Sequence, residues 1–324
     1  MKGKARTLLL ALVLAAFILP SAASAESMPL SCDGAQQQKL PLRRLTAPSG
    51  SEFARRVAVM SEAERDRAIE SQLLAGNIPS FLRQLAPVSL TGQGPDGRLV
   101  RVTICVLPDY LSIGSDADFL LVPMRLATAL RIASRYGYTL PTSKMVDAIY
   151  DQSAVHLLPQ PLPAGDQMRS TEYYVHHNQL ISEQRMALGA RLGLLTSGHK
   201  KDIVIDARLW QSPERVAIYG WHRGSHDPIQ PLSTVHGARY ADYSHGVRLV
   251  STIVYVNGER RSIFSALADP QLAKILNTGG PIPRETELLA KLSVPPEETA
   301  AAWPSGSSQS APIGASGGAT NASR

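Results

Sequence analysis

The sequence predicts an α+β fold with one main domain, in which N-terminal helices are followed by a mixed or antiparallel sheet. Residues 61–76 combine a Ser-x-x-Glu capping box, helically spaced apolar residues and a closing glycine, which indicate an amphipathic helix. Residues 246–267 have the pattern of a C-terminal hairpin, whose Asn257-Gly258 pair suits a type I′ turn. Helical and strand patterns alternate irregularly between these ends, which favours α+β over a regular α/β repeat.

The other elements follow from local patterns along the chain. Helical spacing predicts five further helices, with Gly137 as a C-cap and Thr142 as an N-cap in the middle of the sequence. These predicted helices cover residues 79–88, 125–137, 142–154, 170–189 and 269–280. Runs rich in β-branched residues predict strands within residues 97–108, 109–124, 193–209 and 214–223.

The first 25 residues have the form of a secretory signal peptide, with a basic start, an apolar run and Ala23-Ser24-Ala25 at the end. We therefore expect a secreted or periplasmic protein, cleaved after Ala25. No membrane insertion is expected after cleavage, because no later segment reaches the roughly 18 apolar residues of a membrane helix. Cleavage removes three basic residues and no acidic ones, so the formal charge falls from +6 to +3. This charge is too small to indicate a nucleic-acid partner.

Composition divides the remaining chain into three parts. Residues 26–52 lack periodicity and are expected to form an extended arm, whereas residues 293–324 are rich in Pro, Gly, Ser and Ala and are expected to be disordered. The globular domain is expected over residues 53–292, with the proline-rich stretch 157–166 as its best candidate for an internal boundary.

Cys32 and Cys105 are the two cysteines of the chain. An even number in an oxidising compartment favours a disulfide, which would tie the N-terminal arm to the strand that holds Cys105. The alternative is a buried Cys105 and a free Cys32 on a mobile arm.

Histidines gather in the second half of the chain. Six of the eight lie between His176 and His236, and His245 follows shortly after. Loops 198–202, 220–227 and 236–248 each adjoin a predicted strand, and sites are commonly built from loops held by rigid elements. A sheet that brought these loops to one edge would form a polar cleft. Three side chains would then bind substrate there: Lys200, Lys201 and Trp221.

The first chemical interpretation of this region is a zinc site. His236, Asp242 and His245 have the spacing H-x5-D-x2-H, and His199 or His222 could supply a further ligand. Imidazole and carboxylate ligands suit zinc, which lowers the pKa of a bound water toward neutrality. Exported zinc peptidases that cut peptidoglycan stems resemble this arrangement, although their D-Ala-D-Ala members have H-x6-D and a later histidine ligand.

The second interpretation is metal-free acid–base chemistry on a polysaccharide. Histidine and tyrosine can transfer protons while a cation stabilises developing negative charge. The catalytic candidates in this interpretation are Tyr240, Tyr243, His245 and Arg248.

The segment from Ser244 to Arg248 also resembles the L,D-transpeptidase signature, in which Ser-His-Gly precedes the nucleophilic cysteine. Val247 stands where that cysteine is needed, so the resemblance implies an inactive domain.

A purely structural interpretation accounts for the same residues. The segment would be a polar turn feeding a strand, with Arg248 outward and solvated and with the Tyr243 ring buried while its hydroxyl meets a backbone carbonyl. The scattered basic clusters, including Lys200-Lys201, would likewise be solvated surface.

Several phrases of the sequence resemble a family of exported bacterial proteins without an established activity. They are "GHKKDIVI", "VAIYGWHR" and "DYSHGVRLV", and the resemblance covers about residues 66–276. It implies a single domain and assigns no catalytic residue. Taken together, the sequence predicts a cell-envelope or extracellular hydrolase that acts on a cell-wall or extracellular glycan or peptide, either with zinc as its cofactor or with none. The alternative is a non-catalytic protein that binds such a glycan or peptide.

Overall fold

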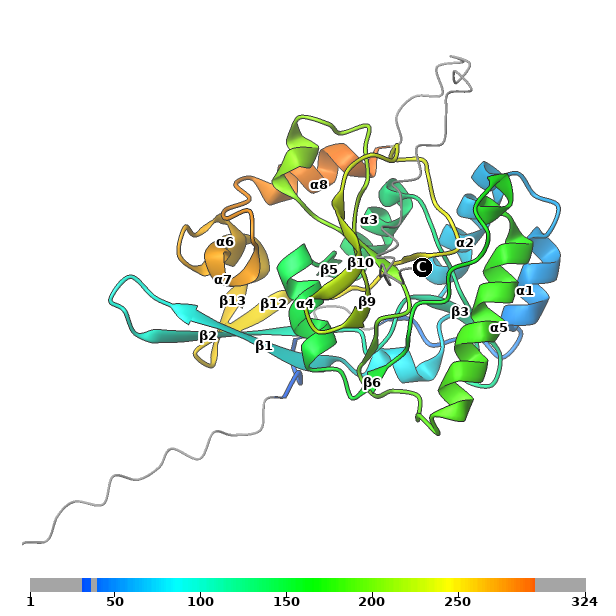
Figure 1. Cartoon of the computed structure of the whole chain (residues 1–324), viewed down its shortest axis with the longest axis horizontal. Helices are drawn as coiled ribbons and strands as arrows, with labels where there is room; N and C mark the ends of the chain where they lie inside the picture. The colour runs from blue at the N-terminus through cyan, green and yellow to red at the C-terminus, as the bar shows by residue number, and fades with distance from the viewer. Residues whose placement is uncertain (1–30, 36–39, 295–324) are drawn as a thin grey trace, which may run out of the picture.

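Figure 1 shows the computed structural model of the chain, which describes residues 31–35 and 40–294. The predicted signal peptide (1–25) and residues 295–324 of the predicted tail lie outside the described residues. Within them the chain forms one mixed α+β fold, which confirms the predicted fold class.

The larger sheet has five strands, all paired antiparallel. Its order is β1 (Ala86–Gln93), β2 (Leu99–Val106), β12 (Val250–Val256) and β13 (Glu259–Ser262), and β5 (Tyr138–Thr139) also pairs with β12. Because β12 comes from the C-terminal half and pairs with β2 from the N-terminal half, the two halves share one sheet. The proline-rich stretch 157–166 therefore does not separate two independent sheets.

The second sheet holds the predicted loops. Its order is β10 (Asp227–Ser233), β9 (Ala217–Gly224), β8 (Lys201–Val204) and β11 (His245–Gly246). β11 runs parallel to β8, and the register pairs His245 with Lys201 and places Gly220 opposite Lys201 on the other side. One sheet thus brings the three loops together. The remaining strands form two small ladders, β3 (Ser112–Gly114) with β4 (Phe119–Leu121) and β6 (Val155–His156) with β7 (Thr196–Ser197).

The helices surround the sheets. Figure 1 shows α1, α2 and α5 on one side of the molecule and α6 and α7 on the opposite side, beyond β13. Their bounds are α1 (Gly50–Val57), α2 (Glu62–Leu74), α3 (Leu126–Arg135), α4 (Ser143–Asp151), α5 (Thr171–Ala187), α6 (Ile263–Ala268), α7 (Leu272–Leu276) and α8 (Glu285–Ser293), with 3-10 turns at Ser80–Arg83, Asp166–Arg169 and Ala207–Trp210.

Local sequence signals place several of these elements correctly. The Ser61 and Glu64 side chains form the predicted capping box of α2, and Thr142 caps α4. Gly76 follows α2 with φ 79°, a left-handed conformation that glycine adopts without strain. The predicted Asn257-Gly258 turn joins β12 to β13, with φ of 50° and 88°.

Other boundaries differ from the predictions. The helix predicted over 79–88 is only a 3-10 turn, because the chain from Ala86 onward pairs with β2 as the missed strand β1. α1 begins at Gly50, inside the predicted extended arm, where the Ser49 side chain caps it. The end of the predicted hairpin is the helix α6, and the helix predicted over 269–280 shortens to α7.

Cys32 and Cys105 form a disulfide, with their Cα atoms 5.7 Å apart. This confirms the predicted pairing and ties the N-terminal segment to β2. The bond closes a separation of 73 residues, for which the chain-entropy model gives about 4 kcal/mol of stabilisation.

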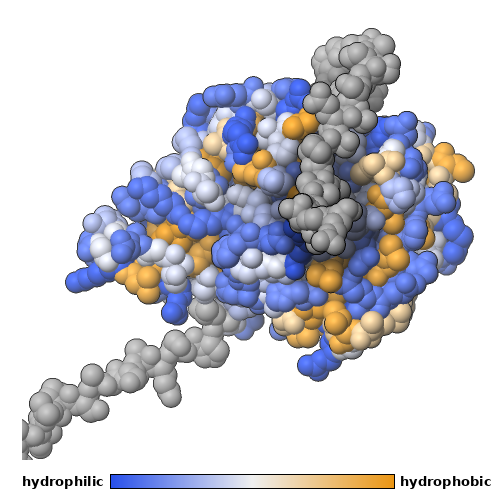
Figure 2. All heavy atoms as spheres, in the orientation of Figure 1, coloured by the Kyte–Doolittle hydropathy of each residue, from blue (hydrophilic) through white to orange (hydrophobic). Residues whose placement is uncertain are grey.

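No helix in the described part of the chain combines the length and apolarity that a bilayer crossing needs. Figure 2 shows hydrophilic residues over most of one face, with hydrophobic residues exposed in several separate places.

Candidate functional site

The β8–β11 ladder places the predicted loops side by side. The Lys201 amide donates to the Ser244 carbonyl at 2.8 Å, and the Trp221 amide donates to the Lys200 carbonyl at 3.0 Å. Gly246 makes this approach feasible, because a Cβ there would lie 2.6 Å from the Tyr110 ring and 2.7 Å from the Lys200 Cβ. The backbone itself therefore holds the candidate residues next to one another.

Five side chains meet at this edge of the sheet, and we call them the His245 cluster: His245, Asp242, Tyr240, His236 and Lys201. The Tyr240 ring stacks on His236 with centroids 4.2 Å apart, and the His245 ring lies 5.7 Å from Tyr240. The Tyr240 hydroxyl donates to Asp242 Oδ2 at 3.0 Å. The cluster thus combines two imidazoles, a carboxylate, a phenol and an ammonium group.

His245 is the least satisfied member of the cluster. Its side chain is fully buried, and neither ring nitrogen has a hydrogen-bond partner among the described residues. Its Nε2 lies 3.9 Å from Asp242 Oδ2, which is too far for a hydrogen bond. Buried polar groups in proteins are nearly always hydrogen-bonded, so this buried imidazole is an exception, which it shares with the His199 ring among the described residues.

Burial and neighbouring charges set the protonation states in this cluster. Burial lowers the pKa of His245 to about 4, with Asp242 opposing the shift, so the imidazole is neutral at neutral pH. Burial raises the pKa of Asp242, but the charges of His245 and Lys201 and the hydrogen bonds from Ser244 outweigh it and leave the pKa at about 2. Burial and the Asp242 carboxylate raise the pKa of Tyr240, which keeps its hydroxyl protonated.

Lys201 packs against Trp221 beside the His245 cluster. The Lys201 ammonium lies 4.8 Å from the centroid of the Trp221 ring, and burial lowers the pKa of this lysine while Asp242 opposes the shift. Trp221 has φ 59°, a left-handed conformation that is uncommon for a bulky residue, and such conformations cluster at functional sites. Its indole nitrogen has no partner in the described part of the chain.

Lys200 points into the interior instead. Its side chain is 1% exposed, and its ammonium donates to the Tyr243 carbonyl and lies 3.2 Å from His177 Nδ1. Burial lowers the pKa of Lys200 to about 7. The interpretation of Lys200-Lys201 as solvated surface is therefore wrong for Lys200, and only Lys201 lies in the His245 cluster.

Arg248 is also buried, which overturns its predicted outward orientation. β11 ends at Gly246 and β12 begins at Val250, so strand alternation does not apply at Arg248. The guanidinium donates to the Leu107 carbonyl at 2.8 Å and to the Thr196 carbonyl at 2.6 Å. It also covers the Tyr110 ring at 4.4 Å. These contacts hold backbone segments together beneath the site.

Tyr243 has the environment that the structural interpretation gave it. Its ring is buried against His177 and Tyr173, and its hydroxyl accepts from the Leu162 amide at 2.7 Å and donates to the Leu162 carbonyl at 3.4 Å. The hydroxyl therefore ties the proline-rich stretch to the site.

The two additional zinc ligands predicted from sequence have other carboxylate partners. His199 Nε2 lies 3.3 Å from Asp109 Oδ1, and His222 Nε2 lies 3.0 Å from Asp147 Oδ1. No group of three or more His, Cys, Asp or Glu side chains within residues 31–35 and 40–294 is arranged to hold a metal ion. The zinc site remains a prediction for His236, Asp242 and His245, the three candidates that lie in one cluster.

Sequence analysis missed a buried polar group under the site. Asp109 Oδ2 accepts from Arg185 at 2.5 Å, and Asp202 Oδ2 accepts from the Tyr110 hydroxyl at 2.7 Å. Burial raises the pKa of Asp202 to about 6, although Arg248 and the hydrogen bond from Tyr110 oppose the shift. Asp109 follows the predicted strand within residues 97–108, and this position after an apolar run was a signal that it is buried. Arg185, on a polar helix, gave no such signal.

No family model matches the chain, and neither the curated proteins nor the solved structures contain a match. The resemblance to exported bacterial proteins therefore stays a prediction, and the site must be interpreted from its own geometry.

Proposed function

We propose that the protein is an exported hydrolase of the cell envelope or extracellular space and that the His245 cluster is its acid–base site. The observation that supports this most is the buried, neutral imidazole of His245 with both ring nitrogens unpartnered among the described residues. A neutral imidazole beside a carboxylate is suited to accept a proton from water.

Each residue of the cluster has a role in this proposal. His245 takes a proton from a water molecule as the water oxygen attacks the scissile bond of the substrate, and it then returns that proton to the leaving group. The Asp242 carboxylate, 3.9 Å from Nε2, stabilises the transient imidazolium. Lys201 stabilises negative charge that develops on the substrate, and the protonated Tyr240 hydroxyl orients Asp242.

The substrate class is inferred from Lys201. This half-buried lysine offers a cation to an acidic group of a substrate, while the Trp221 ring beneath it is buried against Tyr174 and Tyr243. A cell-wall glycan or peptide carries such groups. The signal-peptide pattern and the disulfide support export to the compartment where these substrates occur.

A zinc-dependent form of the same site is the second candidate. His236, Asp242 and His245 lie in one cluster, and the two free nitrogens of His245 could serve a metal as well as a substrate. The positive charge of Lys201 acts on both His236 and His245, which weighs against a divalent cation. Zinc content of the exported protein, measured before and after His236→Ala, separates the two forms.

The test of hydrolysis uses mature protein comprising residues 26–324. It is incubated with purified peptidoglycan, acidic and neutral polysaccharides and model peptides, and soluble fragments are quantified. We expect turnover of one substrate class, its loss in His245→Ala and its retention in His176→Ala, a matched change at an exposed histidine of α5. If folded, metal-replete protein leaves every substrate intact, the hydrolase proposal is wrong and the binding alternative replaces it.

A further inference from the structure

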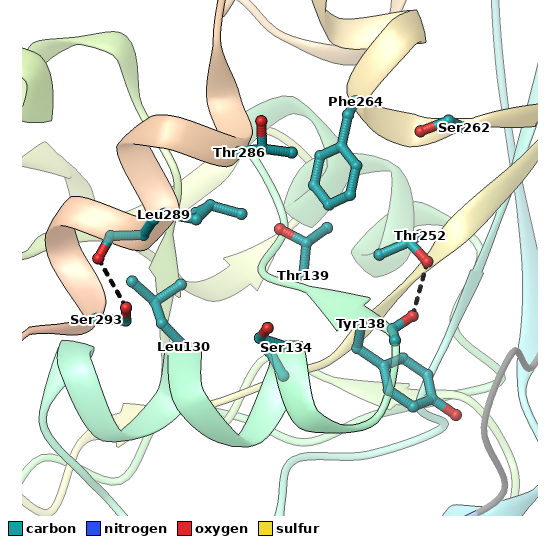
Figure 3. A pocket seen from close by; sticks show the side chains of 13 residues that line it. Leu130, Ser134, Tyr138, Thr139, Thr252, Ser262, Phe264, Thr286, Leu289 and Ser293 are labelled. Carbon is teal, nitrogen blue, oxygen red and sulfur yellow. Dashed lines mark hydrogen bonds between the residues drawn. The ribbon is translucent and has the colours of Figure 1, made fainter.

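A cavity lies on the five-stranded sheet, away from the ladder that holds the His245 cluster. It has a volume of about 490 Å³ and lies between α3, β5, β12, α6 and α8 (Figure 3). Leu130 and Thr139 form part of its buried floor, whereas Ser134, Ser262 and Thr286 lie exposed at its rim. This volume is within the range of small-molecule sites, roughly 300 to 1,000 Å³.

The lining combines hydroxyl groups with apolar surface and carries no charge. Thirteen described residues line the cavity, none of them is Asp, Glu, Lys, Arg or His, and six are serine or threonine. Three of the six hydroxyls have a hydrogen-bond partner: Thr252 donates to the Gly137 carbonyl, Ser293 donates to the Ala290 carbonyl and Thr139 donates to Glu285 Oε1. Figure 3 shows the Phe264 ring and the Thr139 side chain pointing into the same space.

Glu285 lies behind this lining. Its Oε1 is 3.4 Å from the Thr139 hydroxyl, and its Oε2 has no hydrogen-bond partner among the described residues although the residue is 2% exposed. Burial raises the pKa of Glu285 to about 8, so the carboxyl group is mostly uncharged at neutral pH. Glu285 therefore adds no full charge behind the lining at neutral pH, and its contact with Thr139 gives this floor hydroxyl a partner.

We propose that this cavity binds an uncharged saccharide unit. A charged ligand would find no opposite charge in the lining, and burying it there would be costly. A hydrocarbon ligand would cover the exposed rim hydroxyls of Ser134, Ser262 and Thr286 without offering them a hydrogen-bond partner. A neutral sugar offers hydroxyls to the serine and threonine side chains and a C–H face to Phe264, so it satisfies both parts of the lining.

The inference does not depend on hydrolysis at the His245 cluster. Saccharide binding is measured by isothermal titration calorimetry on the mature protein, with a neutral N-acetylglucosamine oligomer and a neutral glucose oligomer as probes. Three variants change the cavity: Phe264→Ala removes the ring, Ser134→Leu fills the rim and Thr139→Val removes a floor hydroxyl. Thr91→Val is the matched control, since Thr91 lies exposed on β1 outside the cavity. Circular dichroism confirms that each variant is folded.

We expect one of the two oligomers to bind, with Kd raised about tenfold or more by Phe264→Ala and Ser134→Leu. Thr91→Val and His245→Ala should leave Kd unchanged. Binding that survives all three cavity variants but disappears in His245→Ala would assign the saccharide to the other site and overturn the inference. Failure of folded wild-type protein to bind either oligomer would overturn it as well, whatever the hydrolase assay shows.

Discussion

Lys201 and His245 are direct neighbours in the parallel ladder between β8 and β11. This pairing joins two segments that are far apart in the sequence and places a cation beside an imidazole that has no partner among the described residues. The candidate site therefore depends on strand register, because a shift of β11 by one residue would turn His245 to the other face of the sheet and away from Lys201.

The titration of His245 is the first prediction. Its pKa is about 4 in the folded protein and roughly 6.5 in an unfolded chain. Because the folded value is lower, the neutral histidine contributes stability that is complete above pH 6.5 and is lost as pH falls toward 4. Asp242 raises the pKa of His245, so Asp242→Asn should lower it further. NMR titration of the ring protons measures both values, and a wild-type pKa near 6.5 would contradict the buried, unpartnered environment.

The contribution of Glu285 to stability should have the opposite pH dependence, which is the second prediction. Its pKa is raised from 4.5 to about 8, so its contribution to stability is complete below pH 4.5 and is lost as pH rises toward 8. Glu285→Gln keeps the shape and cannot ionise. Urea unfolding at several pH values should therefore show wild type losing stability relative to Glu285→Gln between pH 5 and about 8. Parallel pH profiles of the two proteins would mean that Glu285 is not buried as described.

Gly246→Ala should destabilise the protein at the centre of the site. The added Cβ would lie 2.6 Å from the Tyr110 ring and 2.7 Å from the Lys200 Cβ, and overpacking of this kind costs about 1–3 kcal/mol. Gly237→Ala is the control, because its Cβ would meet nothing closer than the Glu214 carbonyl at 3.8 Å. Denaturant unfolding gives the free energies, and equal stability of the two variants would contradict the close approach of β8 to β11.

Arg248→Met tests the assignment of Arg248 to the buried framework. The change removes the donors to the Leu107 and Thr196 carbonyls, and each buried acceptor left without a hydrogen bond costs about 1–3 kcal/mol. Arg98→Met, at a largely exposed arginine, should change the free energy of unfolding by no more than about 0.5 kcal/mol. A small effect at Arg248 would favour the solvated orientation that the strand pattern alone suggested.

Local signals in the sequence predicted much of the fold. The Ser61 capping box, the Thr142 cap and the Asn257-Gly258 turn act through neighbouring residues, so their structural consequences could be inferred from short stretches. The disulfide could be predicted from the number of cysteines, which is two, and from the oxidising compartment that the signal-peptide pattern indicates. The strand β1 was missed because a short apolar run is ambiguous until its partner, here β2, is known.

The interior of the candidate site could not be predicted in the same way. The Asp109–Arg185 ion pair joins residues 76 positions apart, and a charge on a helix surface usually faces solvent. The orientation of Arg248 depends on where β11 ends and β12 begins. These boundaries are set by the pairing of β11 with β8 in one sheet and of β12 with β2 in the other. The sequence singled out the three loops, but their proximity depends on the pairing of β8 with β9 and β11, which local patterns do not reveal.

The central claim is that His245 serves as the base of a hydrolytic site. The most direct test compares the initial rate of His245→Gln with that of wild type on the substrate that wild type cleaves, with His176→Gln as the matched control. Because removal of a general base typically costs about 10²–10⁴-fold in rate, we predict a loss in that range for His245→Gln and none for His176→Gln. A His245→Gln variant that hydrolyses the substrate at the wild-type rate would contradict the account.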